Sequence, residues 1–276
     1  MSQAAGSAPA PKKVTVRSFA QAKERREPLV MVAAYDALFA RLSDEGGVDA
    51  ILVGDSLGNV VAGLDTTVPV TLDQMIYHGA AARRGTTRAL LVVDMPFLTY
   101  QVTTERALLN CGRVMQETRC DALKLEGGSP EMCDTIRALV RTGMPVMGHL
   151  GFTPQSVHTL GGFRVQGRGD DAARQLVDDA RRLEDAGAFS VVLELVPADV
   201  AARVTEAVSI PTIGIGAGAG CDGQVLVLAD LLGLTDAFTP KFLKRYASMA
   251  ESTRDAVRRF SGEVRARTYP GDEHAF

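Results

Sequence analysis

The chain has 276 residues, 46% hydrophobic and 23% charged, which is the composition of a globular protein with one sizeable core or two modest ones. Its 30 Lys and Arg and 33 Asp and Glu residues leave a net charge of −3, so no general attraction to nucleic acid or anionic lipid is expected. No apolar run reaches the ~18 uncharged residues of a membrane span. These features exclude a disordered, fibrous or membrane-spanning protein.

The N-terminal sequence and the cysteine pattern bear on the cellular location of the protein. Residues 1–15 begin with MSQAAGSAPA, which has no apolar signal-peptide segment, and are predicted to form a disordered tail. A single domain is predicted over residues 16–276. Cys111, Cys120, Cys133 and Cys221 form no CxxC pair, so free thiols in a reducing compartment are expected. A cytoplasmic location is predicted.

Short runs rich in Val, Ile and Leu alternate with longer segments of helical periodicity. The predicted strands are 29–34, 50–53, 89–93, 122–125, 145–147, 190–193, 211–215 and, more weakly, 224–228. The predicted helices are 37–45, 72–84, 104–117, 130–142, 170–186 and 198–208. Buried parallel strands need no polar face, so this alternation predicts an α/β fold.

The number of strands distinguishes two α/β architectures. Eight strands in about 200 residues fit a (β/α)₈ TIM barrel. A doubly wound open sheet needs only five to seven strands and is the alternative if the weak run 224–228 is not a strand. Residues 240–267 are predicted to form a C-terminal helical extension, ended by the turn-rich residues 269–273.

Titratable residues stand at the carboxyl ends of six predicted strands, where only turn residues would be expected. The ends are Tyr35-Asp36, Gly54-Asp55-Ser56, Asp94, Lys124-Leu125-Glu126, Gly148-His149 and Glu194. In a barrel these ends meet on the catalytic face. A single Asp after a strand is more often a helix cap or a turn former, so any one of these residues alone has a structural interpretation.

Asp55, Asp94 and Glu126 are three such carboxylates without a Cys or His pattern around them. Clustered carboxylates repel one another unless a cation lies among them. Hard oxygen ligands favour Mg²⁺. A magnesium site is the first hypothesis, and three unrelated cap residues are the alternative.

Three further residues have two interpretations each. Glu194 lies in the apolar stretch 189–197, where removal from water would make a carboxylate a stronger base; it could instead pair with an Arg. Lys124 shares a strand face with Glu126 and either binds an anionic substrate or neutralises that carboxylate. His149 either contacts a carbonyl or carboxylate of the substrate or is structural.

The sequence contains two glycine-rich stretches. Residues 214–219 match G-x-G-x-x-A, but the residues that follow open no helix, so a tight loop is favoured over a dinucleotide site. Residues 161–169, Gly-Gly-Phe-Arg-Val-Gln-Gly-Arg-Gly, are flexible and basic. They suit a lid, an anion-facing loop or a plain surface loop.

Nine short motifs together resemble one family, ketopantoate hydroxymethyltransferase. They are VGDS at 53–56, TVPV at 67–70, VDMPF at 93–97, KLEGG at 124–128, GHLGFTPQ at 148–155, GGFRVQGR at 161–168, ELVP at 194–197, IGIGAG at 213–218 and DGQVL at 222–226. The resemblance extends from Val30 to Glu273, and the order and number of the motifs make it specific.

The resemblance implies a (β/α)₈ barrel of the phosphoenolpyruvate/pyruvate superfamily. It implies transfer of a hydroxymethyl group from methylenetetrahydrofolate to 3-methyl-2-oxobutanoate, giving 2-dehydropantoate for pantothenate synthesis. By this resemblance Asp55 and Asp94 bind Mg²⁺, with Glu126 completing the metal site. Asp55, Ser56, Asp94 and Lys124 bind the keto acid with His149 nearby, and Glu194 accepts the proton. The family resemblance also implies a homo-oligomer, expected to be a decamer.

Two other functions remain as alternatives. A carbon–carbon lyase of the same superfamily would share the barrel and Mg²⁺, but its cysteine-bearing catalytic loop has no counterpart near residues 161–169. A catalytically silent keto-acid or folate-binding protein would not need Glu194 in addition to the acidic cluster and Lys124.

Overall fold

The computed structural model describes residues 12–235 and 239–276. The chain forms two compact units, one up to Val225 and one from Leu226 onward. Residues 1–11 of the predicted tail lie outside the described residues, whereas Val14 is buried and its N–H donates to Arg88 O. Residues 13–15 therefore belong to the folded part.

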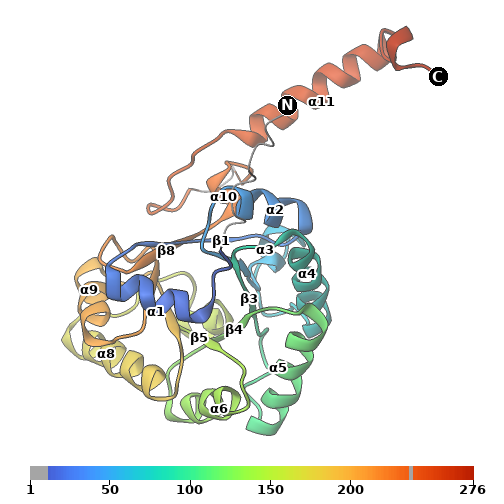
Figure 1. Ribbon diagram of the computed structural model, residues 1–276. Coiled ribbons are helices and arrows are strands. Elements are labelled where there is room, and N and C mark those ends of the chain that lie inside the picture. Colours follow the sequence, from blue (N-terminus) through green and yellow to red (C-terminus); the bar gives the residue numbers. More distant parts are fainter. Residues whose placement is uncertain (1–11, 236–238) are drawn as a thin grey trace, which may run out of the picture. The chain divides into compact units, whose positions relative to one another are not determined.

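Eight parallel strands close into a barrel in chain order (Figure 1). They are β1 (Leu29–Ala33), β2 (Ala50–Val53), β3 (Leu90–Asp94), β4 (Ala122–Glu126), β5 (Val146–Gly151), β6 (Ser190–Glu194), β7 (Thr212–Ile215) and β8 (Gly223–Val227). The predicted (β/α)₈ barrel is confirmed, and the open-sheet alternative is wrong because residues 223–227 do form the eighth strand.

Helices separate most of these strands along the chain. The α-helices are α1 (Val16–Arg25), α2 (Ala37–Glu45), α3 (Leu57–Val60), α4 (Leu72–Gly85), α5 (Thr104–Thr118), α6 (Pro130–Arg141), α7 (Val157–Leu160), α8 (Asp170–Asp185), α9 (Ala198–Ala207), α10 (Leu228–Leu231) and α11 (Met249–Arg265); η1 (Pro154–Ser156) and η2 (Asp272–His274) are 3₁₀ turns. All six predicted barrel helices are present, and α1 and the short helices were not predicted.

Local capping explains where the barrel helices begin and end. Asp36 Oδ1 accepts the Phe39 N–H and Thr103 Oγ1 accepts the Arg106 N–H, each at the start of a helix. The helix α2 ends at Glu45, and Gly46 is its C-cap. Gly47 then takes a φ of +88°, a conformation that favours glycine. Asp36 is therefore a cap residue.

The helical extension begins later than predicted. Regular helix starts at Met249, whereas residues 240–248 form turns and bends. Within this unit the Tyr246 and Met249 N–H groups donate to the carbonyls of Leu231 and Leu232, which end α10. These long-range bonds replace the local bonds that a helix from Pro240 would have made.

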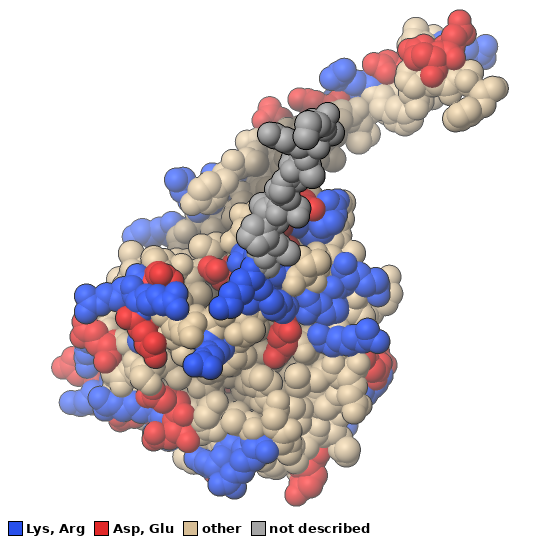
Figure 2. All heavy atoms as spheres, viewed as in Figure 1, with Lys and Arg blue, Asp and Glu red and all other residues tan. Residues whose placement is uncertain are grey.

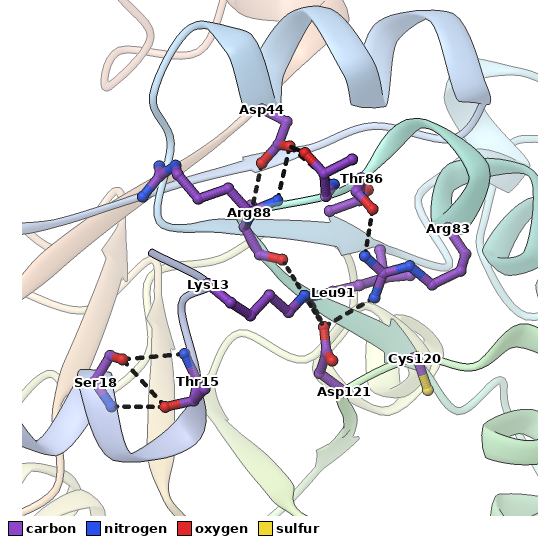
Figure 3. Close-up of polar contacts among 12 residues, drawn as sticks. Lys13, Thr15, Ser18, Asp44, Arg83, Thr86, Arg88, Leu91, Cys120 and Asp121 are labelled. Atoms are coloured by element: carbon purple, nitrogen blue, oxygen red, sulfur yellow. Dashed lines mark hydrogen bonds and ion pairs between the residues drawn. The ribbon is translucent and has the colours of Figure 1, made fainter. Parts of the chain in front are cut away.

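The helix α1 packs at the end of the barrel where the strands begin. Phe19 is fully buried, and its ring meets the Phe189 ring edge-on at 5.6 Å. Lys23 Nζ donates to Asp222 and to the Ile210 carbonyl, just before β8 and β7. Lys13 Nζ forms an ion pair with Asp121, just before β4 (Figure 3). The amino-terminal segment thus stabilises the end opposite the strand termini that carry the titratable residues.

No helix in the described part of the chain is long and apolar enough to cross a membrane. On the face shown in Figure 2, groups of positive and of negative side chains are both present among uncharged ones.

Candidate active site

The strand register brings the predicted site residues together at the carboxyl ends of neighbouring strands. Asp94 on β3 lies beside Lys124 on β4, and Glu126 lies beside His149 on β5. Each carries a titratable group into the same end of the barrel, and all four residues are buried. Parallel pairing thus produces the clustering that the strand-end pattern predicts.

Asp55 joins this cluster from the turn after β2. Its backbone N–H donates to Asp94 Oδ2 at 3.1 Å, so the turn is tied to the next strand. Gly54 permits this close approach, because a Cβ there would lie 2.8 Å from Ser56 Oγ and 3.4 Å from Asp94 Oδ2. Ser56 Oγ in turn shares a 2.8 Å hydrogen bond with the Tyr35 hydroxyl.

Lys124 is the cation at the centre of the cluster. Its Nζ lies 3.0 Å from Asp94 Oδ1 and 3.2 Å from His149 Nδ1. Burial by itself would lower the pKa of the ammonium group, but the carboxylates of Asp94, Glu126 and Asp55 outweigh it and raise the pKa. Lys124 therefore stays charged and is suited to hold an anion.

Three carboxylates crowd around this single ammonium group. Burial raises the pKa of Asp55 to about 7, and the charges of Asp94 and Glu126 add to the effect. Burial also raises the pKa of Asp94, although Lys124 opposes it. The cluster has more negative charge than its own side chains neutralise, which is the electrostatic condition for binding a further cation.

His149 connects the cluster to Glu194 on β6. Its Nδ1 lies 3.5 Å from Glu126 Oε1, and its Nε2 lies 3.2 Å from Glu194 Oε2. Burial and Lys124 lower the pKa of the imidazole, but the contacts with Glu126 and Glu194 raise it to about 8. His149 is thus placed to orient the Glu194 carboxylate.

Glu194 is the most accessible carboxylate of the group. Its side chain is 18% exposed, whereas those of Asp94 and Glu126 are 4% and 5% exposed. The fully apolar surroundings expected from its sequence neighbours are therefore not found, because successive strand residues point to opposite faces and His149 occupies the near side. Neither is there an Arg partner: the ion-pair partner of Glu194 among the described residues is His149.

The end of β5 approaches Glu194 closely. The Phe152 N–H donates to the Glu194 carbonyl at 2.8 Å. Gly151 takes a φ of +89°, and a Cβ there would lie 2.2 Å from that carbonyl oxygen. A side chain at position 151 would therefore displace the strand end that carries Glu194.

The oxygen atoms of the cluster fit Mg²⁺. Asp94 Oδ1 and Glu126 Oε1 are buried and turned into the cluster, where their neighbours are Lys124 Nζ at 3.0 Å and His149 Nδ1 at 3.5 Å. All the candidate ligands are hard oxygens. Within the described ranges no three His, Cys, Asp or Glu side chains are already arranged as a ligand cage. Magnesium commonly uses one or two carboxylates and completes its coordination with water and substrate oxygens, so the residues fit this ion.

Two further residues of the site were not predicted as such. Gln155, at the end of the GHLGFTPQ motif, donates from Nε2 to Asp55 Oδ2 at 3.0 Å. Tyr100, in the loop after β3, donates its hydroxyl to Gln155 Oε1 at 2.8 Å. The motif around Gln155 was a signal for that residue, but nothing in the periodicity of the sequence indicated Tyr100.

The chain is similar to known proteins over nearly its whole length. The chain matches the family described as ketopantoate hydroxymethyltransferase over residues 13–272. It belongs to this family. The resemblance seen in the sequence motifs is thereby confirmed.

Relatives of the family are similar over nearly their whole length. The chain is 53% identical to 3-methyl-2-oxobutanoate hydroxymethyltransferase of Syntrophotalea carbinolica, covering 96% of this chain and 99% of the relative. It is 54% identical to the enzyme of the same name from Pelobacter propionicus, covering 96% and 98%.

Solved structures show the same fold at low identity. Phosphonopyruvate hydrolase in complex with oxalate and Mg²⁺ has a TM-score of 0.60 at 11% identity, covering 95% of this chain and 91% of that one. A 2,3-dimethylmalate lyase of the PEP mutase/isocitrate lyase superfamily has a TM-score of 0.58 at 16% identity, with coverage of 95% and 91%. At this identity the likeness concerns the barrel and not the reaction.

Proposed function

We propose that this chain transfers a hydroxymethyl group from methylenetetrahydrofolate to 3-methyl-2-oxobutanoate and so forms 2-dehydropantoate for pantothenate synthesis. The observation that carries the proposal is the convergence of Asp55, Asp94, Lys124, Glu126 and Glu194 at one end of the barrel. Membership of the ketopantoate hydroxymethyltransferase family supports it.

The keto acid is anionic, and the chain offers it fixed donors. Lys124 Nζ, held beside Asp94, attracts the carboxylate of the substrate, and the Ser56 hydroxyl, held by Tyr35, is placed to donate a hydrogen bond. Both groups are positioned before the substrate arrives. Their role is to orient the branched carbon of the substrate toward the base.

Asp55 and Asp94 would hold a Mg²⁺ ion, with Glu126 completing the site directly or through water. When bound, the ion supplies Lewis-acid stabilisation of the negative charge that develops on the keto oxygen.

Glu194 is the base in this proposal. Its partly exposed carboxylate removes the proton from C3 of the keto acid, while His149 Nε2 fixes the position of Oε2. The carbon nucleophile then forms the new bond to the methylene carbon of the donor. The two C–N bonds of that carbon break, water supplies the hydroxyl oxygen, and tetrahydrofolate leaves with the C3 proton and one proton from the water. Since the donor carries glutamate carboxylates, the basic segment 161–169 is proposed as the anion-facing loop that receives it; Gln166 N–H in that segment donates to the carbonyl of Leu195, next to Glu194.

We propose a homo-oligomer, a decamer by family resemblance, and a cytoplasmic location, which agrees with free thiols at Cys111, Cys120, Cys133 and Cys221.

The deciding experiment is incubation of the protein with 3-methyl-2-oxobutanoate and Mg²⁺ in D₂O without folate, followed by NMR of the C3 position. The proposed reaction predicts exchange at C3, and product formation once methylenetetrahydrofolate is added. A silent binding protein would bind the keto acid without exchange. A carbon–carbon lyase would instead cleave a 2-methylisocitrate-like acid and leave C3 of this keto acid unlabelled.

A further inference from the structure

Gln155 makes five hydrogen bonds, and two of them go to carboxylates of the acidic cluster. The residue is buried and lies in η1, beyond the end of β5. Its Nε2 donates to Asp55 Oδ2 and to the Met95 carbonyl, at 3.0 and 2.9 Å. Its backbone N–H donates to Glu126 Oε2 at 3.1 Å. One residue thus contacts carboxylates that come from two different strands.

The orientation of the Gln155 amide is fixed from its other side. Oε1 accepts the Tyr100 hydroxyl at 2.8 Å and Gln101 Nε2 at 2.9 Å. All hydrogen-bonding positions of the amide are therefore used. A flipped amide would place its NH₂ group against the Tyr100 and Gln101 donors and its oxygen against the Asp55 carboxylate and the Met95 carbonyl. Tyr100 is itself held, because its oxygen accepts the Glu126 N–H at 3.1 Å.

The three carboxylates share a pattern that follows from these bonds. One oxygen of each accepts a hydrogen bond from the protein: Asp55 Oδ2, Asp94 Oδ2 and Glu126 Oε2. The other oxygens of Asp94 and Glu126 are buried and face cationic or ring nitrogens, Lys124 Nζ at 3.0 Å and His149 Nδ1 at 3.5 Å. Gln155 supplies two of these three bonds, one to Asp55 and one to Glu126, and so fixes how both carboxylates are turned.

We propose that Gln155 is a positioning residue that orients the Asp55 and Glu126 carboxylates for a divalent cation, with Tyr100 fixing the direction of its amide. The inference rests on the proposed function, since it assigns the cation to the same cluster. Hydrogen bonds to metal-binding carboxylates typically change metal affinity 10- to 100-fold when they are lost.

The test measures binding of Mn²⁺ alone, as a paramagnetic probe for Mg²⁺, to the full chain by electron paramagnetic resonance. Gln155→Met keeps the length of the side chain and the backbone bond to Glu126 but removes the donor to Asp55. We expect its Kd for Mn²⁺ to rise about 10-fold or more. Tyr100→Phe removes one hydroxyl and should raise Kd by a smaller factor, because Gln101 still contacts Oε1.

The control is Gln175→Met on the exposed surface of α8, where the amide contacts Asp179, and its Kd should equal that of the original chain. A second readout separates positioning from packing. Turnover of Gln155→Met should recover as the Mg²⁺ concentration rises, whereas a packing defect would lower the melting temperature and would not respond to Mg²⁺.

The outcomes distinguish this inference from the proposed function. An unaltered chain that binds Mn²⁺ and exchanges C3, beside a Gln155→Met variant of equal Mn²⁺ affinity, would overturn the inference and leave the function standing. If Gln155→Met does not fold, Tyr100→Phe decides, and an unchanged Kd in that variant would overturn it. An unaltered chain that neither binds Mn²⁺ nor exchanges C3 would contradict the proposed function itself.

Discussion

Glu194 combines access to a ligand with a fixed orientation, and this distinguishes it from the buried carboxylates around it. If it is the base, Glu194→Gln removes the proton acceptor but keeps the shape of the side chain. Turnover should fall about 10²- to 10⁴-fold, the usual contribution of a general base, with a smaller change in keto-acid binding. The measurement is C3 exchange in D₂O by NMR beside steady-state kinetics.

Glu206→Gln, on the exposed face of α9, is the matched control and should exchange at the original rate. Undiminished exchange in Glu194→Gln would assign the base to another residue.

Asp94 contributes to the cluster through both of its oxygens, since Oδ2 holds the Asp55 turn and Oδ1 faces Lys124. A cation that binds only the folded chain raises its melting temperature in proportion to the logarithm of its concentration. We expect Mg²⁺ to raise the melting temperature of the unaltered chain, and Asp94→Asn to reduce that rise strongly. Asp134→Asn, an exposed residue of α6, is the control; an identical Mg²⁺ titration for Asp94→Asn would argue against a ligand role.

The site residues that lie at strand ends could be predicted from the sequence, because the apolar strands are recognisable and their ends meet on one face of the barrel. Asp36 and Asp55 both follow a strand, yet the first caps α2 while the second enters the cluster. Periodicity cannot separate these two cases, because the difference depends on where the next helix starts. Tyr100 and Gln155 reach the cluster from loops, whose course is set by tertiary contacts.

The link between α2 and the loop before β3 depends on one carboxylate, that of Asp44 (Figure 3). Its oxygens accept the backbone N–H groups of Thr87, Arg88 and Ala89 and the Thr87 hydroxyl. Burial would raise the pKa of Asp44, but these hydrogen bonds outweigh it and lower the pKa from 3.8 to about 2.

A lowered pKa means that the folded chain favours the charged form, so the stabilisation is complete above the unfolded pKa and is lost as the pH falls toward 2. We expect Asp44→Asn to lower the free energy of unfolding by about 1–3 kcal/mol at pH 6. The difference from the unaltered chain should shrink by about half at pH 3. Urea unfolding at both pH values measures this, and a difference independent of pH would contradict the assignment.

The sequence of the segment 161–169 suits a lid, an anion-facing loop or a plain surface loop. Phe163 is 72% exposed, although its ring lies 4.8 Å from that of Phe152, and Arg164 and Arg168 are exposed. If this loop receives the glutamate carboxylates of the donor, Arg164→Ala with Arg168→Ala should raise the donor KM about 10-fold and leave C3 exchange without folate unchanged. Arg174→Ala with Arg181→Ala on α8 is the charge-matched control. An unchanged donor KM would leave the segment as a plain surface loop.

The fold of the whole barrel was predictable because eight apolar runs at regular spacing allow few other architectures. The helix α1 was not predictable in this way. Its contacts join Lys23 to Ile210 and Asp222, nearly 200 positions away. The periodicity of a short segment cannot predict contacts between residues so far apart in the sequence. The same reason applies to residues 240–248, where bonds back to α10 replaced the expected helix.

At the scale of the whole molecule, the expected property is assembly into a homo-oligomer. In the unit from Leu226 onward, α11 has 17 residues and none is buried; Val257, Phe260 and Val264 are 57%, 54% and 45% exposed. Most of the stability of a helix in a protein comes from packing an apolar face against another surface. If copies of the chain associate as the family resemblance implies, native mass spectrometry should give about ten times 29.3 kDa. Val257→Asp with Phe260→Asp should then lower that mass, while Arg254→Ala on the same helix should not. A mass of one chain at micromolar concentration would contradict the oligomer.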